Sequence, residues 1–299
     1  MTAPTEQGAF YGTRSLLQVL VQSPGRGSVP VGESVDWPDY ASRGFMLDVG
    51  RRFFTPEFVR DYISMMSWFK LNEFQIHLMD NEISPAGGNW ADAQAGFRLK
   101  SDNPAFAGLA STDGAYDRAD WQSFEDTAAA HAVTIIPRSR AAHARSVVRW
   151  KPELGTNGGN SDHLDLSKPE ATTVMKSIFS EFAPWFEGPD VHMGVDEYYA
   201  SPALFRDYFN TMAAHVRSLG KHPAPGAASP RCTATPTATT VTSRSTPGTV
   251  AGTRSSRPTP TATGSSTPTT RRSTSCRSRT TTTATGSTTS GSIRPGRPT

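Results

Sequence analysis

The chain has 299 residues and a formal net charge of +3, and this mean hides two different parts. From Pro223 to the C-terminus there are ten arginines and no acidic residue, whereas the preceding residues hold 20 basic and 27 acidic side chains. The tail therefore carries +10 and the rest −7. With Val241, Val250 and Ile293 as its only large aliphatic residues, the tail cannot bury a core of its own.

The sequence also argues against two classes of location and one class of site. It has no run of about 20 consecutive apolar residues, which a membrane-spanning helix needs. The segment Met1–Phe10 lacks the charged-then-apolar pattern of a secretory signal. Both cysteines, Cys232 and Cys276, lie in the tail, so we expect no disulfide and no cysteine-based metal site in the folded part.

The first 222 residues show strand patterns that alternate with helical patterns. A lead-in segment is expected at 1–42, with helical spacing at Arg14–Gln22 and a Pro- and Gly-rich turn at Ser23–Gly32. Strands are predicted at Gly44–Val49, Glu73–Met79, Val133–Ile136 and Val191–Gly194. Helices are predicted at Pro56–Phe69, Asp120–His131, Lys168–Phe186 and Ser201–Leu219, with Thr55 as the N-cap of the first. The Gly- and Asp-rich stretch Asn81–Asp117 and the stretch after the third strand are predicted as loops.

Four strands alternating with four helices favour a parallel α/β fold. A (β/α)₈ barrel needs eight such units and about 250 residues, and only four units precede the change in composition. An open doubly wound sheet suits four strands better, and periodicity alone does not choose between the two.

Polar residues follow the predicted strands, where parallel β/α folds place their active sites. Asp196 and Glu197 follow the apolar run Val191–Val195 of the fourth strand. An adjacent Asp-Glu pair is usually a solvated turn. At a strand end, however, two neighbouring carboxylates shift each other's pKa values apart, so that one can act as an acid while the other stays ionised. The other candidates are Asp80 after the second strand and Arg138, Arg140 and His143 after the third.

Three separated motifs then carry a resemblance. They are RGFMLD at Arg43–Asp48, KLNEFQIHLMD at Lys70–Asp80 and HMGVDE at His192–Glu197. In order and spacing they resemble the family 20 glycoside hydrolases, the β-N-acetylhexosaminidases, and the resemblance runs from about Gly8 to His222.

The resemblance implies a (β/α)₈ TIM barrel, a retaining mechanism assisted by the substrate's own 2-acetamido group, and no cofactor or metal. Glu197 is then the general acid and base, and Asp196 orients the acetamido group. Arg43 and Asp80 bind sugar hydroxyls, and His143 lines the site near the acid. The implied partners are glycans containing N-acetylhexosamine, with neither nucleic acid nor membrane. Full-length relatives are often secreted.

Each assignment has a structural alternative. Arg43 could form a salt bridge at the bottom of the barrel, and His143 could be an ordinary loop histidine. His77 and His192 are expected to be interior histidines with satisfied hydrogen bonds. Asp48 is expected to pair with a neighbouring arginine.

The sequence departs from the family pattern after the third strand. The family usually has Pro-Glu-Ile-Asp, a short turn and His, whereas this chain has PRSRAAH at Pro137–His143. Two arginines replace the acidic pair, which should impair activity. Arg138 and Arg140 would also lower the pKa of a nearby Glu197, which is unfavourable for a general acid.

The second departure is the tail, because the family continues with four more barrel units and the match stops at about His222. The divisions are thus a remnant of an N-terminal α+β domain at 1–42, a partial catalytic barrel at 43–222 and a disordered tail at 223–299. Our hypothesis is a frameshifted hexosaminidase gene, and the alternatives are a Ser/Thr/Pro stalk and a basic arm. The nucleotide sequence decides between them.

Half a barrel leaves sheet edges unpaired, so we expect an unstable chain with negligible turnover. A non-catalytic, carbohydrate-binding fragment and a lacto-N-biosidase specificity remain alternatives, and GlcNAc and GalNAc are both possible substrates.

Overall fold

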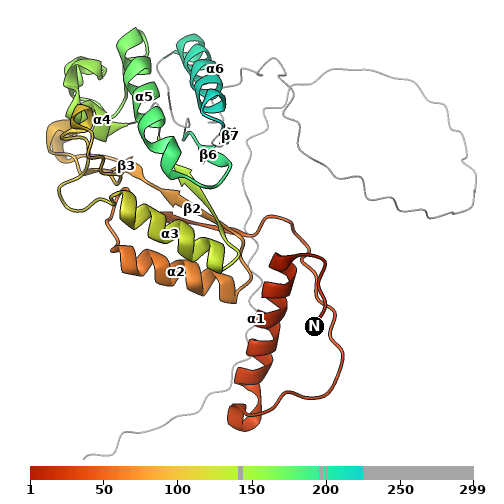
Figure 1. Cartoon of the computed structure of the whole chain (residues 1–299). Helices are drawn as coiled ribbons and strands as arrows, with labels where there is room; N and C mark the ends of the chain where they lie inside the picture. Colours follow the sequence, from red (N-terminus) through yellow and green to blue (C-terminus); the bar gives the residue numbers. More distant parts are fainter. Residues whose placement is uncertain (141–143, 195–197, 199–200, 225–299) are drawn as a thin grey trace, which may run out of the picture. The chain divides into compact units, whose positions relative to one another are not determined.

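A computed structural model of the chain describes residues 1–140, 144–194, 198 and 201–224 (Figure 1). The α-helices are α1 (Glu6–Gln22), α2 (Pro56–Trp68), α3 (Arg118–Ala130), α4 (Arg145–Trp150), α5 (Pro169–Phe182) and α6 (Pro202–Ser218). The strands are β1 (Gly44–Asp48), β2 (Glu73–His77), β3 (Met79–Asn81), β4 (Ala95–Phe97), β5 (Thr134–Arg138), β6 (Asp190–His192) and β7 (His222–Ala224).

Five strands form one parallel sheet in the order β1-β2-β5-β6-β7. Each new strand along the chain joins the same side of the sheet, and a helix precedes each addition. A doubly wound sheet reverses direction at its switch point, whereas a β/α barrel adds its strands in sequence. The strand order therefore rejects the doubly wound alternative and gives the first part of a (β/α)₈ barrel.

The N-termini of α2 and α3 are capped by side chains. The Thr55 hydroxyl accepts a hydrogen bond from the backbone N–H of Phe58 at the start of α2, with Pro56 in the first helical position. Asp117 and Asp120 form a reciprocal capping box at the start of α3. The cap at Thr55 was predicted from the sequence, and four of the predicted helices are correct to within a few residues at most of their ends.

The hydrophobic core lies between the helices and one face of the sheet. Phe74 and Ile76 of β2 and Ile135 of β5 are buried against the helices that cover this face, and α2 and α3 lie side by side over it (Figure 1). Ile63 of α2 and Phe124 of α3 are fully buried.

The opposite face of the sheet carries a line of polar residues at its carboxyl edge. Asp48, His77, Arg138 and His192 are successive partners in the registers of β1, β2, β5 and β6. Because side chains alternate along a strand, residues in one register line share a face. Farther along the same face of β1, Met46 is 47% exposed, and among the described strands β1 and β7 are the two edges of the sheet.

Several sequence predictions need correction. The predicted loop at Asn81–Asp117 begins in a short antiparallel ladder of β3 with β4, in which Asp80 faces Gly96. The loop after the third strand contains α4, and β7 crosses the boundary predicted at His222. These elements are only three to six residues long, too short for hydrophobic periodicity to detect.

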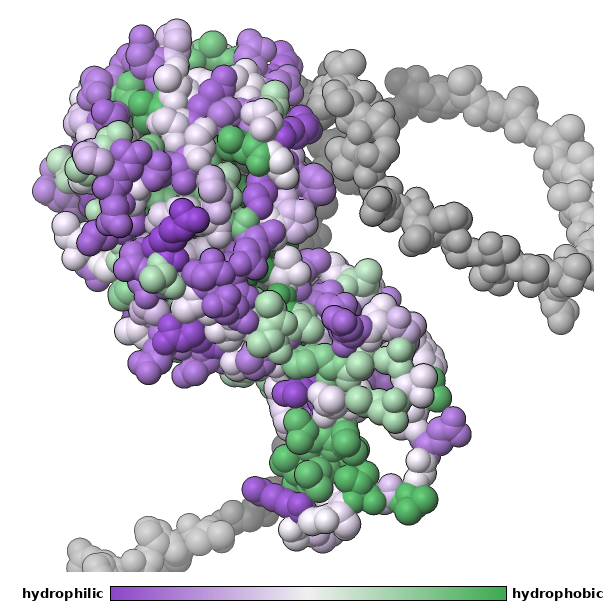
Figure 2. All heavy atoms as spheres, viewed as in Figure 1, coloured by the Kyte–Doolittle hydropathy of each residue, from purple (hydrophilic) through white to green (hydrophobic). Residues whose placement is uncertain are grey.

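The helix of the lead-in segment begins at Glu6 rather than Arg14. Gln18 of α1 donates to the carbonyl of Trp68, and Tyr11 donates to the carbonyl of Ala132. No residue of α1 is buried, and Leu16 and Val19 are among its exposed apolar side chains. Apolar residues gather on the surface of this segment (Figure 2). No helix in the described part of the chain is both long and apolar enough to span a membrane.

Candidate active site

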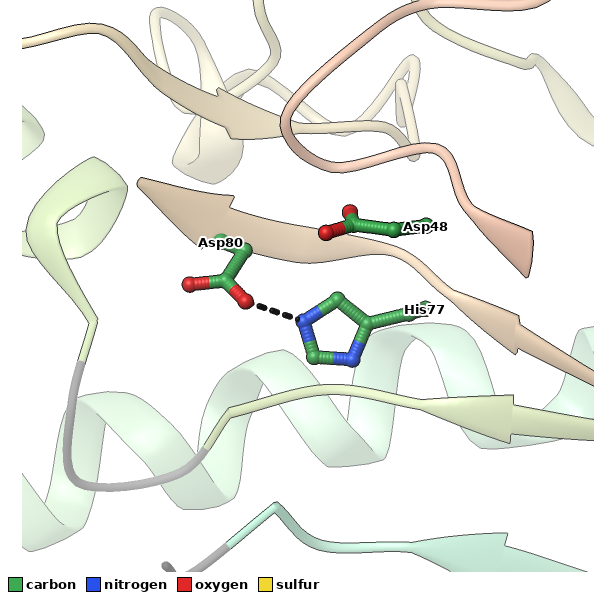
Figure 3. A group of neighbouring side chains, drawn as sticks. All are labelled: Asp48, His77 and Asp80. Atoms are coloured by element: carbon green, nitrogen blue, oxygen red, sulfur yellow. Dashed lines mark hydrogen bonds and ion pairs between the residues drawn. The ribbon is translucent and has the colours of Figure 1, made fainter. Parts of the chain in front are cut away.

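Asp80 lies at the carboxyl edge of the sheet, where several donors contact its carboxylate; Figure 3 shows it with His77 and Asp48. Its side chain is only 2% exposed. One carboxylate oxygen lies 2.8 Å from Nε2 of His77 and 2.9 Å from Nη1 of Arg51. The other accepts the backbone N–H of Asn81 at 2.8 Å and lies 3.4 Å from Nη1 of Arg140. Both oxygens therefore have donors in place before any ligand binds.

These contacts determine the charge of Asp80. Burial by itself would raise the pKa of the carboxyl group, but the hydrogen bond with His77 and the positive charge of Arg140 outweigh it and hold the pKa below its usual value. Asp80 is thus an ionised acceptor at neutral pH. As an ionised carboxylate it can accept hydrogen bonds, but it cannot act as a proton donor.

Arg51 is a further member of this cluster and was not among the residues predicted from the sequence. It follows β1 at the carboxyl edge, and its Nη1 lies 2.6 Å from Asp48 Oδ2 as well as 2.9 Å from Asp80. Its Nε donates to the carbonyl of Asn81 at 2.9 Å. The expectation that Asp48 pairs with a neighbouring arginine is confirmed. The sequence position could have indicated Arg51, because it comes after the first strand and therefore lies at the same end of the sheet as Asp80. Arg43 comes before that strand.

Arg43 lies at the opposite edge of the sheet from Asp80. Its guanidinium donates to the backbone carbonyls of Tyr40 at 2.7 Å, Ala41 at 3.2 Å and Lys70 at 2.8 Å. The amino and carboxyl ends of parallel strands are at opposite edges, so the structure does not bring Arg43 and Asp80 together. Its role in sugar binding stays a prediction. The contacts correspond to the structural alternative, with carbonyl oxygens in place of the expected salt bridge.

The remaining predicted residues, His143, Asp196 and Glu197, lie outside the described residues. The strands that lead to them end on the same edge as Asp80: β5 ends at Arg138 and β6 at His192. His192 is buried, and its Nδ1 accepts the backbone N–H of Gly194 at 3.1 Å. His192 is therefore an interior histidine with a hydrogen-bond partner, as predicted. His77 is also interior, but only its Nε2 has a partner, Asp80, and its buried Nδ1 has none among the described residues.

Asp48, His77 and Asp80 also form a group that could bind a metal ion, since one possible ligand atom from each lies within 4.8 Å of the others (Figure 3). Nη1 of Arg51, however, already lies within hydrogen-bonding distance of both carboxylates. A metal ion would fit this donor set only if the guanidinium moved away, so the described residues fit an arginine better than a metal.

A sequentially ordered parallel sheet with ionisable side chains at its carboxyl edge is the arrangement of a β/α-barrel enzyme. The comparisons with known proteins agree. Residues 40–221 match the catalytic domain of glycosyl hydrolase family 20, and the chain belongs to this family of glycoside hydrolases.

Two relatives illustrate the sequence similarity. The β-hexosaminidase of Akkermansia muciniphila is 29% identical over 209 residues, which cover 64% of this chain and 41% of the relative. The lacto-N-biosidase of Bifidobacterium bifidum is 29% identical over 199 residues, which cover 65% of this chain and 16% of the relative. The chain thus spans less than half the length of either relative.

The fold agrees with a solved structure of the family. The crystal structure of the β-N-acetylhexosaminidase from Bacteroides fragilis superposes with a TM-score of 0.63 at 22% identity, over 75% of this chain and 48% of that one. At this identity the likeness supports the fold alone.

Proposed function

We propose that the chain carries the first half of the catalytic barrel of a β-N-acetylhexosaminidase, which hydrolyses terminal GlcNAc or GalNAc residues. One observation carries the proposal within a chain of this family: the ion pair between Arg51 and Asp80. It joins residues that follow two separate strands at the carboxyl edge of the sheet, within 2.9 Å, where β/α barrels bind substrate.

The proposed reaction retains the configuration at the anomeric carbon. The carbonyl oxygen of the 2-acetamido group attacks this carbon as the glycosidic bond breaks, and Glu197 donates its proton to the departing oxygen. Asp196 orients the acetamido group and stabilises the positive charge of the oxazolinium ion. Water then attacks the anomeric carbon and gives its proton to Glu197, which restores both the acetamido group and the acid.

Arg51 and Asp80 form the hydroxyl-binding part of this site. The ionised carboxylate of Asp80 accepts a hydrogen bond from a sugar hydroxyl, and the guanidinium of Arg51, whose side chain is 41% exposed, donates a hydrogen bond to a hydroxyl oxygen. Charge-assisted hydrogen bonds of this kind are short and strong. We assign to Arg51 the role that the sequence analysis gave to Arg43, because Arg51 is the arginine beside Asp80. His143 is proposed to line the site near the acid.

We further propose that this chain turns over little or no substrate. Arg140 reaches to within 3.4 Å of Asp80, so the loop that departs from the family pattern adds positive charge to the site. Such charge lowers the pKa of a nearby general acid and weakens its power to donate a proton. The sheet edges at β1 and β7, which no further described strand pairs with, act in the same direction by destabilising the fold.

The test uses the full chain. It measures hydrolysis of 4-nitrophenyl N-acetyl-β-D-glucosaminide, and it measures GlcNAc binding by titration calorimetry. We expect no turnover above that of Glu197→Gln, and GlcNAc binding that Arg51→Ala weakens about tenfold, as the loss of one charge-assisted hydrogen bond predicts. Asp190→Asn, at the amino end of β6, is the control.

Each other outcome is informative. Turnover that Glu197→Gln abolishes would overturn the impairment and support the hydrolase. Binding that Arg51→Ala leaves unchanged would refute the proposed site. The similarity to a lacto-N-biosidase makes the 4-nitrophenyl glycoside of lacto-N-biose the second substrate to test, and cleavage of it alone would establish that specificity. Sugar binding without cleavage of either substrate is the result that the proposed impairment predicts, and a non-catalytic, carbohydrate-binding fragment would give the same result.

A further inference from the structure

Arg98, which directly follows β4, is a fully buried arginine that no part of the proposed chemistry uses. Its guanidinium makes five hydrogen bonds. Nε donates to the carbonyl of Val49 at 2.6 Å, and Nη2 donates to the carbonyl of Gly50 at 3.0 Å. The carboxylate of Asp113 accepts from Nη1 at 2.6 Å and from Nη2 at 3.1 Å, and the carbonyl of Gly114 accepts from Nη1 at 2.7 Å. A guanidinium has five N–H donors, so every donor of Arg98 has an acceptor within the protein.

The five acceptors come from two separate loops. Val49 and Gly50 begin the loop from β1 to α2, and Asp113 and Gly114 belong to the loop between β4 and α3. Burying an arginine is costly unless its charge is paired and its donors are satisfied. The bidentate carboxylate of Asp113 supplies the charge, and its pKa is held low by the hydrogen bond with Arg98. Arg98 therefore holds the two loops at a fixed separation.

The loop after β1 is held from its other side as well. The backbone N–H groups of Val49 and Gly50 both donate to the carbonyl of His77. A Cβ on Gly50 would lie 2.6 Å from the backbone N of Asp80, and a Cβ on Gly96 would lie 2.0 Å from the carbonyl oxygen of Gly50. Only glycine permits these approaches. The backbone next to Arg51 is therefore packed closely against the β3–β4 ladder.

We propose that Arg98 and Asp113 are a positioning pair that holds the guanidinium of Arg51 against Asp80. The two carbonyls that Arg98 binds immediately precede Arg51 in the chain, so their position sets where the Arg51 side chain starts. The side chain of Gln94 also donates a hydrogen bond to the backbone carbonyl of Arg51, at 2.8 Å. The inference deepens the proposed sugar site and rests on it for its functional meaning, while the positioning itself is a property of this chain.

The first experiment needs no sugar. Hydrogen exchange of the Arg51 Nε–H, which donates to Asn81, is followed by ¹⁵N-edited NMR in the full chain. Asp113→Asn is the main variant, because Asp113 is 59% exposed and its replacement keeps the shape of the side chain. We expect this exchange to accelerate about tenfold, as the loss of one charged hydrogen-bond partner predicts.

The control for this experiment is Asp190→Asn, which removes an exposed pair with His222 at the opposite edge of the sheet and should leave the Arg51 signal unchanged. Arg98→Lys, with three donors in place of five, should give at least the effect of Asp113→Asn. The proposal is wrong if Asp113→Asn leaves the hydrogen exchange of Arg51 unchanged while the Arg98 Nε–H exchanges faster. The pair of Arg98 and Asp113 would then stabilise only its own loops.

The second experiment measures GlcNAc affinity in a double-mutant cycle. If Asp113 acts through Arg51, Asp113→Asn should raise Kd about threefold in the natural background, and by clearly less once Arg51 is alanine. An equal loss in both backgrounds would show a general structural effect and overturn the proposal. Absence of any sugar binding in the natural chain would refute the proposed function instead, and the exchange experiment would still decide whether Arg51 is positioned.

Discussion

Replacing Asp80 by Asn removes one negative charge from the carboxyl edge of the sheet and changes little else in shape. The native carboxylate is 2% exposed and lies within 3.4 Å of Arg51, Arg140 and His77. Removing one partner of a buried ion pair costs about 3 to 5 kcal/mol, because the remaining charge stays buried without compensation. Arg51 is partly exposed and keeps Asp48, so we place the loss of unfolding free energy near the lower end, at about 3 kcal/mol.

The pH dependence provides the sharper test. The pKa of Asp80 is depressed in the folded state, so its contribution is complete above the pKa of the unfolded chain and is lost as the pH falls through the folded value. Once native Asp80 is protonated, it is uncharged like Asn. The difference between native chain and variant should therefore be largest at neutral pH and shrink toward zero below the usual Asp pKa of about 3.9.

The assay is urea unfolding followed by tryptophan fluorescence, between pH 7 and pH 2.5. It uses a low protein concentration so that association through the open edges of the sheet is suppressed. Asp190→Asn is the control, and as an exposed pair with His222 it should cost less than about 1 kcal/mol. A difference between native chain and Asp80→Asn that stays constant over the whole pH range would refute the assignment of Asp80 as an ionised, ion-paired group.

Three further predictions concern the fold of the chain. Gly96→Ala places a Cβ 2.0 Å from the carbonyl oxygen of Gly50. We therefore expect the free energy of unfolding, measured in urea, to fall by about 3 kcal/mol or more. A value unchanged from that of the native chain would contradict the close approach. Glu125 is buried with its pKa raised by burial, so the native chain should lose stability as the pH rises through that pKa. Glu125→Gln should then be the more stable of the two by about 1 kcal/mol at pH 8 and should lose this advantage at pH 4; equal pH profiles in urea unfolding would show that the carboxyl is not perturbed. Met46→Lys on edge strand β1 should reduce the association of chains measured by light scattering. The control is Met65→Lys on α2, which should not reduce it, although the native Met65 is 48% exposed and Met46 is 47% exposed. Equal effects of the two substitutions would show that the strand edge is not the cause of association.

Local physics explains which features were predictable from the sequence. The N-cap at Thr55, the apolar strand at Gly44–Asp48 and the placement of Asp80 after a strand depend on residues close together in the chain. Such features can be read from spacing and side-chain chemistry alone. The separated motifs indicated the family in the same way, since each motif is a short, contiguous pattern.

The short elements were beyond this kind of prediction. The β3–β4 ladder has three residues in each strand, and β7 includes a proline and lies in a stretch of low-complexity composition. Neither has a hydrophobic period of its own. They form because a neighbouring strand supplies hydrogen-bond partners, which is information held by residues far away in the chain.

The sequence by itself determined the alternation of strands and helices, the start of most helices and the presence of carboxylates after the strands. Only the tertiary structure decided that the strands add in barrel order and that Arg51, not Arg43, meets Asp80. It also showed that all five N–H donors of Arg98 bind backbone carbonyls and Asp113. The physical reason is that the sheet brings together the ends of strands some 30 residues apart, so an ion pair such as Arg51 with Asp80 depends on strand order and direction, which no local pattern records.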